Sequence, residues 1–197
     1  RAYLERRGFG PEAWARHRIG FAPEGWRNLS DHLTRQGASL SDLVEAGLLV
    51  EPQKEASGDG SKAPWDRFRN RVIFPIPDAQ GRICAFGART LEPDGKPKYL
   101  NSSDGPLFHK GKTLYRYKAA REQLAELKDG PLARGLIVTE GYVDAIALAE
   151  AGLPTAVAPL GTALTEDQLQ MLWRAGPEPI LCFDGDAAGL RAAHKAI

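Results

Sequence analysis

From residue 135 to the end of the chain, short apolar runs alternate with longer segments in which apolar residues recur every three or four positions. The short runs are typical of buried strands, and the longer segments are typical of amphipathic helices. The predicted strands are GLIVTE (135–140), TAVAPLG (155–161) and PILCFDGD (179–186). The predicted helices cover 142–152, 165–176 and 187–197. Strands that alternate with helices in this way predict a parallel sheet with helices on its faces.

Two kinds of capping signal support these predicted helices. Thr165 and Gln168 have the spacing of a capping box at the start of the second helix. Gly152 and Gly176 stand where the C-terminal caps of the first and second helices belong.

The first half of the chain has a less regular pattern. Residues 1–50 predict short amphipathic helices, one of them with Ser41 as its N-cap, and the polar stretch 51–66 predicts a loop. The runs RVIFPI and RICAFGART flank the turn PDAQG and predict a β-hairpin, in which Pro75 and Pro77 indicate an edge or a bulge. Residues 98–115 predict loops with short strands, and a helix is predicted after them. We therefore expect an α/β protein in which an α+β N-terminal subdomain precedes the parallel sheet.

The composition is that of an ordinary globular protein. The 197 residues are 43% hydrophobic, with 26 Lys and Arg against 25 Asp and Glu. No apolar stretch approaches the roughly 20 residues that a membrane span needs, and no secretory signal is visible, so we expect a cytoplasmic protein with no membrane partner. Cys84 and Cys182 lie in apolar runs, which favours buried reduced thiols over a disulfide or a zinc site.

The charge is distributed unevenly along the chain. Residues 61–118 hold 12 Lys and Arg against 5 Asp and Glu, whereas residues 119–197 hold 6 against 11. A basic segment therefore precedes an acidic one. Solvated faces on each segment would explain this equally well, so the charges alone leave the choice open.

Three carboxylates follow two of the predicted strands. Glu140 ends one strand, and Asp184 and Asp186 end another. Because ligands bind beyond the carboxyl ends of the strands in an open parallel sheet, we expect these acids to converge on one edge. Clustered carboxylates repel one another unless they bind a hard cation such as Mg²⁺ or Mn²⁺. The alternative is a favourable charge at a helix N-terminus, and Asp144, in the first turn of the predicted helix 142–152, fits both interpretations.

The segments TEGYVDAIALAEAG, APLGTALTEDQL and LCFDGDAAGLRAA resemble the Toprim domain, a metal-binding fold of bacterial primases, topoisomerases and some repair proteins. Upstream, RFRNRVIFPI, GRICAFGART and KYLNSSDGPLFHKGKTLY resemble consecutive motifs of bacterial replicative DNA primases. The resemblance covers essentially all 197 residues. It implies the RNA polymerase core of a primase, with a basic N-terminal subdomain at 1–118 (helices in 1–50, a loop at 51–66, mixed α/β at 67–118) and a Toprim subdomain at 119–197.

The resemblance also implies roles for individual residues. It assigns Glu140, Asp184 and Asp186 to the catalytic Mg²⁺ or Mn²⁺ site, with Asp144 as a further candidate ligand. The family's nucleotide contacts match Arg89, Lys98, Tyr99, Asn101 and Lys110. The family's template-binding ridge matches Arg67, Arg69 and Arg71, which would share one face if they alternated along a strand. For any one of these basic residues, the alternative is an exposed solubilising charge.

The implied partners are a single-stranded DNA template, nucleoside triphosphates, the RNA primer product and a replicative helicase that binds a domain outside this chain. Zinc is expected only in a further domain. The chain starts without methionine and stops within a helical pattern, which indicates an excerpt of a longer protein whose Toprim subdomain is truncated. The family's last acidic motif is expected beyond Ile197, so we expect the excerpt alone to bind metal weakly and to be inactive.

Two other classes remain open at this point. A Toprim topoisomerase or nuclease would need a tyrosine nucleophile or a nuclease partner domain, and none of the five tyrosines lies in a recognisable nucleophile motif. A Toprim module that binds nucleic acid without catalysis is the other alternative, against which the retained Glu140, Asp184 and Asp186 argue.

Overall fold

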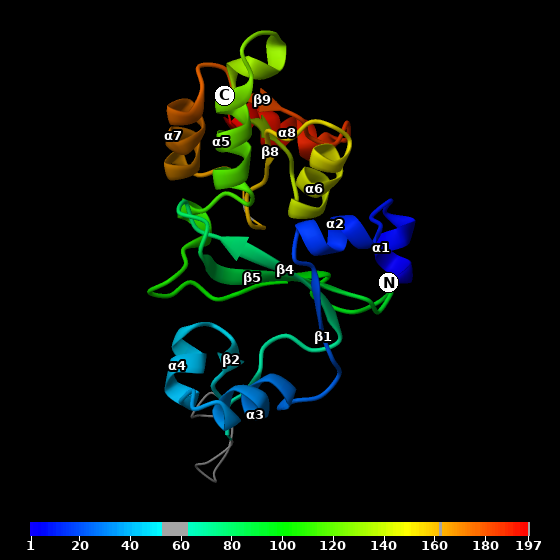
Figure 1. The fold of residues 1–197 in the computed structure, drawn as a ribbon, viewed down its shortest axis with the longest axis vertical. Helices are drawn as coiled ribbons and strands as arrows, with labels where there is room; N and C mark the ends of the chain where they lie inside the picture. The colour runs from blue at the N-terminus through cyan, green and yellow to red at the C-terminus, as the bar shows by residue number, and fades with distance from the viewer. Residues whose placement is uncertain (53–62, 162, 197) are drawn as a thin grey trace. The chain divides into compact units, whose positions relative to one another are not determined.

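The structure is a computed structural model and describes residues 1–52, 63–161 and 163–196 (Figure 1). The chain forms two compact units. Unit 1 comprises Arg1–Arg18, Ile76–Ile83 and His109–Ile197, and unit 2 comprises Ile19–Pro75 and Cys84–Phe108. Each unit draws on separate stretches of the chain, whereas the predicted domains 1–118 and 119–197 are contiguous. Most of the loop predicted at 51–66 lies outside the described residues.

A four-stranded sheet has the strand order β1-β4-β5-β6. Its strands are β1 (Gly20–Ala22), β4 (Arg71–Pro77), β5 (Ile83–Thr90) and β6 (Tyr99–Asn101). β4 and β5 are the arms of the predicted hairpin, and the Asp78 carboxylate in its turn accepts the backbone N–H groups of Gln80 and Arg82. The pairing of β1 with β4 ends at Ile73. Pro75 and Pro77 therefore lie where β4 has no β1 partner. Proline has no backbone N–H to donate to such a partner.

The helices of unit 2 are α3 (Asn28–Arg35) and α4 (Leu40–Glu45), and its short strands β2 (Leu49–Val50) and β3 (Trp65–Asp66) pair antiparallel. The N-cap of α4 is Ser39, whose hydroxyl accepts the N–H of Asp42 at 3.1 Å. The predicted cap at Ser41 is therefore wrong. Ser41 already lies within the helix, and only Ser39 has the extended backbone that directs a hydroxyl to the first-turn amides.

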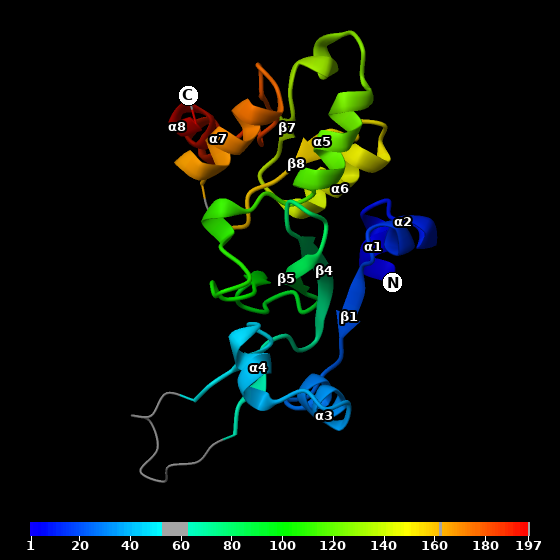
Figure 2. The ribbon, with the colours of Figure 1, turned by 60° about the vertical axis from the view of Figure 1, so that its left-hand side comes forward.

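Unit 1 contains the predicted parallel sheet, in the order β8-β7-β9. Figure 2 labels β7 and β8 of this sheet. Its strands are β7 (Ile137–Val138), β8 (Ala156–Val157) and β9 (Ile180–Leu181), each shorter than predicted. Its crossover and terminal helices are α6 (Tyr142–Glu150), α7 (Glu166–Ala175) and α8 (Ala187–Ala196). Helix α5 (Tyr117–Glu126) precedes them, together with the 3-10 helices η1 (Lys110–Lys112) and η2 (Pro131–Arg134). The predicted α/β class is confirmed.

The core of unit 1 joins helices to the strands they flank. A buried cluster contains apolar side chains of α5, β7, β8 and α7, among them Leu124, Val138, Val157 and Leu172. The hydroxyl of Tyr117 donates to the carbonyl of Met171 at 3.0 Å, which ties α5 to α7. This packing holds the central strand β7, and with it the residues that follow β7.

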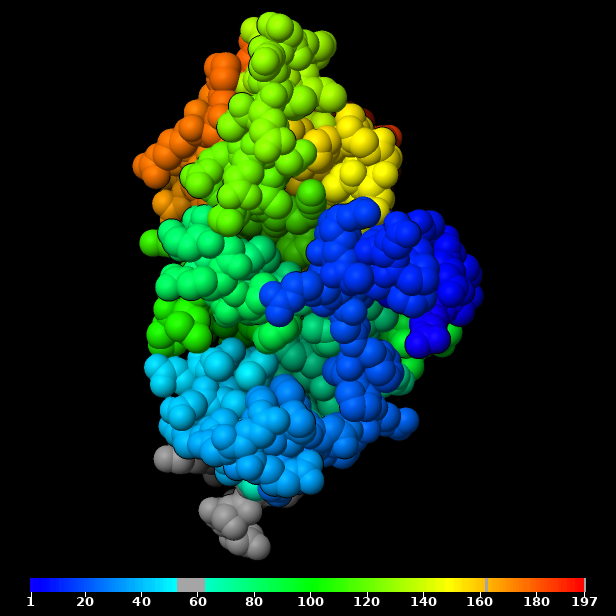
Figure 3. Space-filling model, in the orientation of Figure 1, coloured from blue at the N-terminus to red at the C-terminus, as the bar shows by residue number. Residues whose placement is uncertain are grey.

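The first two helices, α1 (Ala2–Arg6) and α2 (Pro11–Arg16), also belong to unit 1. The Glu150 carboxylate at the end of α6 accepts hydrogen bonds from Arg16, at 2.5 and 2.6 Å, and lies 2.8 Å from Nε2 of His17. Figure 3 shows the blue N-terminal residues against the yellow segment that contains α6. We call Arg16, His17 and Glu150 the α2–α6 clamp.

Two of the predicted helix caps in unit 1 are present, and a third differs in its backbone conformation. The capping box at Thr165 and Gln168 is present, and Gly152 follows α6 with a φ of +89°. Gly176 is the C-cap of α7, but it has an extended backbone, and a Cβ there would lie 2.6 Å from the carbonyl oxygen of Arg134. Both cysteines are reduced thiols as predicted, but neither is fully buried. Cys84 is half-buried, and Cys182 is exposed where the chain leaves β9, an edge strand of the sheet. Among the described residues, no helix is long and apolar enough to cross a bilayer.

Candidate metal centre and nucleic-acid contacts

The parallel pairing of β7 with β9 continues into the side chain of Glu140. The N–H of Cys182 donates to the carbonyl of Val138 at 2.8 Å, and the N–H of Asp184, two residues on, donates to Oε1 of Glu140 at 3.0 Å. The carboxylate thus takes the position that the next carbonyl would occupy in a regular ladder. β7 and β9 are also the neighbours at which the strand order reverses, which is where ligands bind in open parallel sheets.

Asp186 has a different local role. Its Oδ1 accepts the N–H groups of Ala188 and Gly189, both at 2.8 Å, so it caps the first turn of α8. This interaction turns one carboxylate oxygen toward the helix. These hydrogen bonds of Glu140 and Asp186 each use a single carboxylate oxygen.

Asp144, in the first turn of α6, lies within the electrostatic range of Asp184. Burial raises the pKa of Asp144, and the charge of Asp184 raises it further, while Arg7 opposes this effect. A bound cation would reduce the repulsion between two such carboxylates.

The Glu140 carboxylate therefore contacts the backbone of Asp184, but the predicted cluster of three acids is not assembled. Among residues 1–52, 63–161 and 163–196, no group of three or more His, Cys, Asp or Glu side chains is arranged to hold a metal ion. The Asp186 side chain is directed to the α8 amides, which sequence spacing alone does not reveal. The donors present are carboxylate oxygens, and these suit Mg²⁺ or Mn²⁺.

The predicted nucleotide contacts fall in both units. Arg89 pairs with Tyr99 and Gly87 with Asn101 in the β5–β6 register, so Arg89, Tyr99 and Asn101 share one face. The Arg89 guanidinium lies 6.0 Å from the centre of the Tyr99 ring. Lys98 precedes β6, and its carbonyl accepts the N–H of Thr90 at 3.1 Å. The fifth predicted contact, in η1 of unit 1, is Lys110.

The predicted arginine ridge does not lie on one strand face. β3 ends at Asp66 and β4 begins at Arg71, and the connection contains Asn70 in a left-handed conformation with a φ of +48°. Arg67 donates to the carbonyl of Asn101 at 2.9 Å, and burial lowers the pKa of Arg67. Arg71 is 9% exposed and donates to the carbonyl of Pro97 at 2.8 Å. These two arginines thus bind backbone carbonyls of another segment. The alternation of arginines along the sequence cannot predict such tertiary contacts.

Arg69 has a different neighbour, which the sequence analysis did not single out. Its guanidinium lies 4.0 Å from the centre of the Trp26 ring, and Trp26 packs edge-on against Trp65 with ring centres 6.2 Å apart. Trp26 is 61% exposed. A tryptophan beside an arginine in the polar stretch PEGWRN was the available signal, because aromatic rings next to basic residues can stack on bases of single-stranded nucleic acid.

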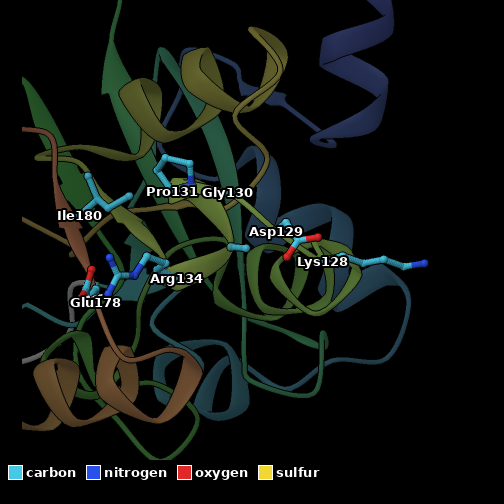
Figure 4. A pocket seen from close by; sticks show the side chains of 8 residues that line it. Lys128, Asp129, Gly130, Pro131, Arg134, Glu178 and Ile180 are labelled. Atoms are coloured by element: carbon cyan, nitrogen blue, oxygen red, sulfur yellow. Dashed lines mark hydrogen bonds and ion pairs between the residues drawn. The ribbon is translucent and has the colours of Figure 1, made fainter.

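A pocket of about 660 Å³ in unit 1 lies away from these acids (Figure 4). It is lined by Lys128–Pro131 and by Arg134 and Glu178, which form an ion pair, with Ile180 at the start of β9. These residues precede β7 and β9, whereas Glu140 and Asp184 follow them. The pocket contains none of the predicted site residues.

Comparison with known proteins assigns this arrangement to a family. The family "DNA primase catalytic core, N-terminal domain" matches residues 1–121, and the "Toprim domain" family matches residues 134–197. The chain belongs to the DNA primase catalytic core family. The predicted resemblance is confirmed, and the primase match upstream of the Toprim region is not what a topoisomerase would give.

Individual primases are similar along the whole chain. The DNA primase of Halalkalibacterium halodurans is 46% identical over 196 residues, which cover 100% of this chain and 31% of that protein. A crystal structure of a DNA primase domain from Pseudomonas aeruginosa is 46% identical with a TM-score of 0.85, and the match covers 99% of this chain and 57% of that one. A DnaG primase catalytic domain bound to ssDNA is 45% identical with a TM-score of 0.81, over 99% of this chain and 56% of that one. The chain thus spans about a third of the length of this curated relative.

Proposed function

We propose that this chain is the catalytic segment of a DNA primase, which synthesises short RNA primers on single-stranded DNA by metal-dependent nucleotidyl transfer in the cytoplasm, at the replication fork. The observation that carries the proposal is the contact between Glu140 and Asp184 at the carboxyl edge of a Toprim sheet. Family membership over the full chain supports the same reaction.

In this proposal Glu140, Asp184 and Asp186 hold Mg²⁺ or Mn²⁺, with Asp144 close by. The metal would supply charge neutralisation at the α-phosphate and lower the pKa of the primer 3′-hydroxyl. The Glu140 carboxylate holds the β9–α8 turn through the N–H of Asp184, and this positions the Asp184 side chain at the sheet edge. Asp186 fixes the start of α8. The last acidic motif, the zinc-binding domain and the helicase-binding domain remain expectations for the longer protein.

We further propose that the face of unit 2 shared by Arg89, Tyr99 and Asn101, with Lys98, binds the nucleoside triphosphate. Lys110, in unit 1, stays a predicted nucleotide contact. Guanidinium and ammonium groups suit phosphate oxygens, and the Tyr99 ring, at 40% exposure, offers a surface for a base. The template would contact Arg67 and Arg69, together with Trp26, whose exposed ring is already paired with the guanidinium of Arg69. The third arginine of the predicted ridge, Arg71, is buried and would hold backbone rather than touch DNA.

A second candidate function is a nucleic-acid-binding Toprim module without catalysis. The observation in its favour is that the described residues lack an assembled group of three acids. Glu140 distinguishes the two functions, because only the primase needs its charge.

The test is template-dependent RNA synthesis by the full-length parent protein and its Glu140→Gln variant. Gln keeps an oxygen that can accept the N–H of Asp184 but removes the charge. We expect RNA synthesis to fall by roughly 100-fold or more, as when one preorganised electrostatic group is removed. Glu166→Gln, an exposed acid in the first turn of α7, should leave synthesis unchanged. RNA synthesis that is unaffected by Glu140→Gln, or absent from the parent while DNA binding persists, would contradict the proposal.

A further inference from the structure

A glycine inside α8 borders all three acids of the candidate metal centre. Gly189 is buried in the first turn of α8, and its N–H donates to Oδ1 of Asp186 at 2.8 Å. A Cβ atom on Gly189 would lie 2.1 Å from the carbonyl oxygen of Asp184 and 2.7 Å from Oε1 of Glu140. Both distances are shorter than Cβ contacts in proteins allow, so any side chain there must displace the backbone of the β9–α8 turn and also the Glu140 carboxylate.

Local conformation does not explain this glycine. Gly189 is helical, and alanine is favoured over glycine inside a helix because glycine loses more conformational freedom on folding. Glycine at this position lowers the helix propensity of α8, but it allows other atoms to lie close to the helix backbone. What approaches is the acceptor oxygen of the Glu140–Asp184 hydrogen bond, together with the backbone of Asp184 itself.

We propose that Gly189 is a positioning residue of the acidic centre: the absence of a side chain lets α8 close onto Glu140 and the Asp184 backbone, which sets the separation of the carboxylates. Gly189 acts through these acids and touches no substrate. The inference rests on the proposed function, because it concerns the metal that Glu140, Asp184 and Asp186 are proposed to hold.

The chain offers a matched control one residue from two of the same acids. Gly185 lies between Asp184 and Asp186, and a Cβ there would meet no heavy atom within 4 Å. Gly185→Ala therefore adds the same methyl group to the same turn without the collision. If turn flexibility alone mattered, both variants would behave alike.

The experiment compares Gly189→Ala with Gly185→Ala in the full-length parent protein, by hydrogen exchange without metal and by Mn²⁺ binding followed by electron paramagnetic resonance. For Gly189→Ala we expect faster exchange in peptides that contain the Asp184 amide, and Mn²⁺ binding weakened by about tenfold or more, as for other changes behind a metal ligand. Gly185→Ala should match the parent in both. Parent-like exchange and Mn²⁺ affinity in Gly189→Ala would overturn the inference.

Two further variants separate this inference from the proposed function. If Glu140→Gln abolishes RNA synthesis while Gly189→Ala is like the parent, the inference fails and the proposed function stands. If Gly189→Ala folds poorly, thermal unfolding of Glu140→Ala and of the double variant replaces the comparison. Because Glu140→Ala removes one of the atoms in collision, Gly189→Ala should lower the melting temperature less in that background than in the parent. Equal losses in both backgrounds would overturn the role given to Glu140 and would leave only the Asp184 backbone against Gly189.

Discussion

The side chain of Gln168 is fully buried, although amide side chains are usually exposed. Its Oε1 accepts the N–H of Thr165 at 3.2 Å, and its Nε2 donates to the carbonyls of Lys110 and Thr113, each at 2.8 Å. The start of α7 thereby holds the η1 segment. The capping box could be predicted from the spacing of Thr165 and Gln168, but the two carbonyl contacts could not, because their partners lie more than 50 residues away.

Replacing this amide should destabilise unit 1. Gln168→Ala leaves two buried carbonyls without their donor and removes half of the capping box, so we expect the free energy of unfolding to fall by about 2–3 kcal/mol. Urea unfolding followed by circular dichroism measures this. Gln170→Ala, an exposed glutamine in the same helix, is the control and should change stability by no more than about 0.5 kcal/mol. Equal effects of the two substitutions would show that the buried contacts are not the cause.

At the scale of the element, the sequence predicted the helices and strands of unit 1 in the correct order because their apolar periodicity is local. It was less successful at helix starts. Either Ser39 or Ser41 could cap α4 by residue type, and the choice depends on where the backbone leaves the extended conformation. The residue types of the two serines do not decide that point.

The α4 cap gives a direct test of this correction. Ser39→Ala removes the acceptor of the Asp42 N–H, and we expect a loss of about 1 kcal/mol in the free energy of unfolding. Ser41→Ala changes a solvent-exposed residue within the helix and should cost less than about 0.5 kcal/mol. Thermal unfolding of the two variants side by side is the measurement. A larger loss for Ser41→Ala would restore the cap predicted from sequence.

The α2–α6 clamp makes the association of two elements sensitive to pH. The His17 side chain is 9% exposed, and burial lowers its pKa, an effect that the hydrogen bond to Glu150 opposes and that Arg116 and Arg16 reinforce. A histidine with a lowered folded-state pKa binds fewer protons folded than unfolded. Its stabilising contribution is therefore complete above the unfolded pKa of about 6.5 and is lost as the pH falls toward the folded value.

We accordingly expect the melting temperature to fall between about pH 7.5 and pH 5.5, and to fall less in His17→Gln, which has no ionisable group. Differential scanning calorimetry at the two pH values measures this. The lowered pKa of Glu150, caused chiefly by its hydrogen bond with Arg16, has its effect in a more acidic window, as the pH falls below about 4.5. The same pH dependence in the parent and in His17→Gln would assign the effect to other groups.

At the scale of the whole molecule, each compact unit is made of stretches that are far apart in the sequence. Residues 1–18 belong with the Toprim region in unit 1, and so do Ile76–Ile83 at the tip of the hairpin. Local patterns cannot reveal this, because the contacts join residues as far apart as Arg16 and Glu150. The division into 1–118 and 119–197 thus remains a prediction from family resemblance.

The exposed tryptophans provide a test of DNA binding by the whole protein. Trp26 and Trp173 are 61% and 60% exposed, but only Trp26 has an arginine, Arg69, stacked on its ring among the described cation–π contacts. If Trp26 stacks on template bases, Trp26→Ala should weaken single-stranded DNA binding by about 1–3 kcal/mol, whereas Trp173→Ala should not.

Fluorescence anisotropy with a labelled oligonucleotide at several salt concentrations measures this effect. Because the phosphate contacts of the arginines remain in both variants, the salt dependence should stay close to that of the parent. An equal loss of affinity in both variants would point to general hydrophobic exposure rather than to a stacking site.

The sequence by itself determined the alternation of strands and helices, because hydrophobic periodicity acts over short stretches of chain. It also predicted that Glu140 and Asp184 follow strands at one edge of a parallel sheet, because ligands bind at the carboxyl ends of such strands. Only the tertiary structure decided which way the functional side chains turn. Asp186 caps α8, and Arg67 and Arg71 donate hydrogen bonds to carbonyls that are distant in the sequence. Gly189 has no side chain, which lets Glu140 and the Asp184 backbone lie close to α8. Each of these outcomes depends on which backbone groups the fold brings within hydrogen-bonding or van der Waals distance.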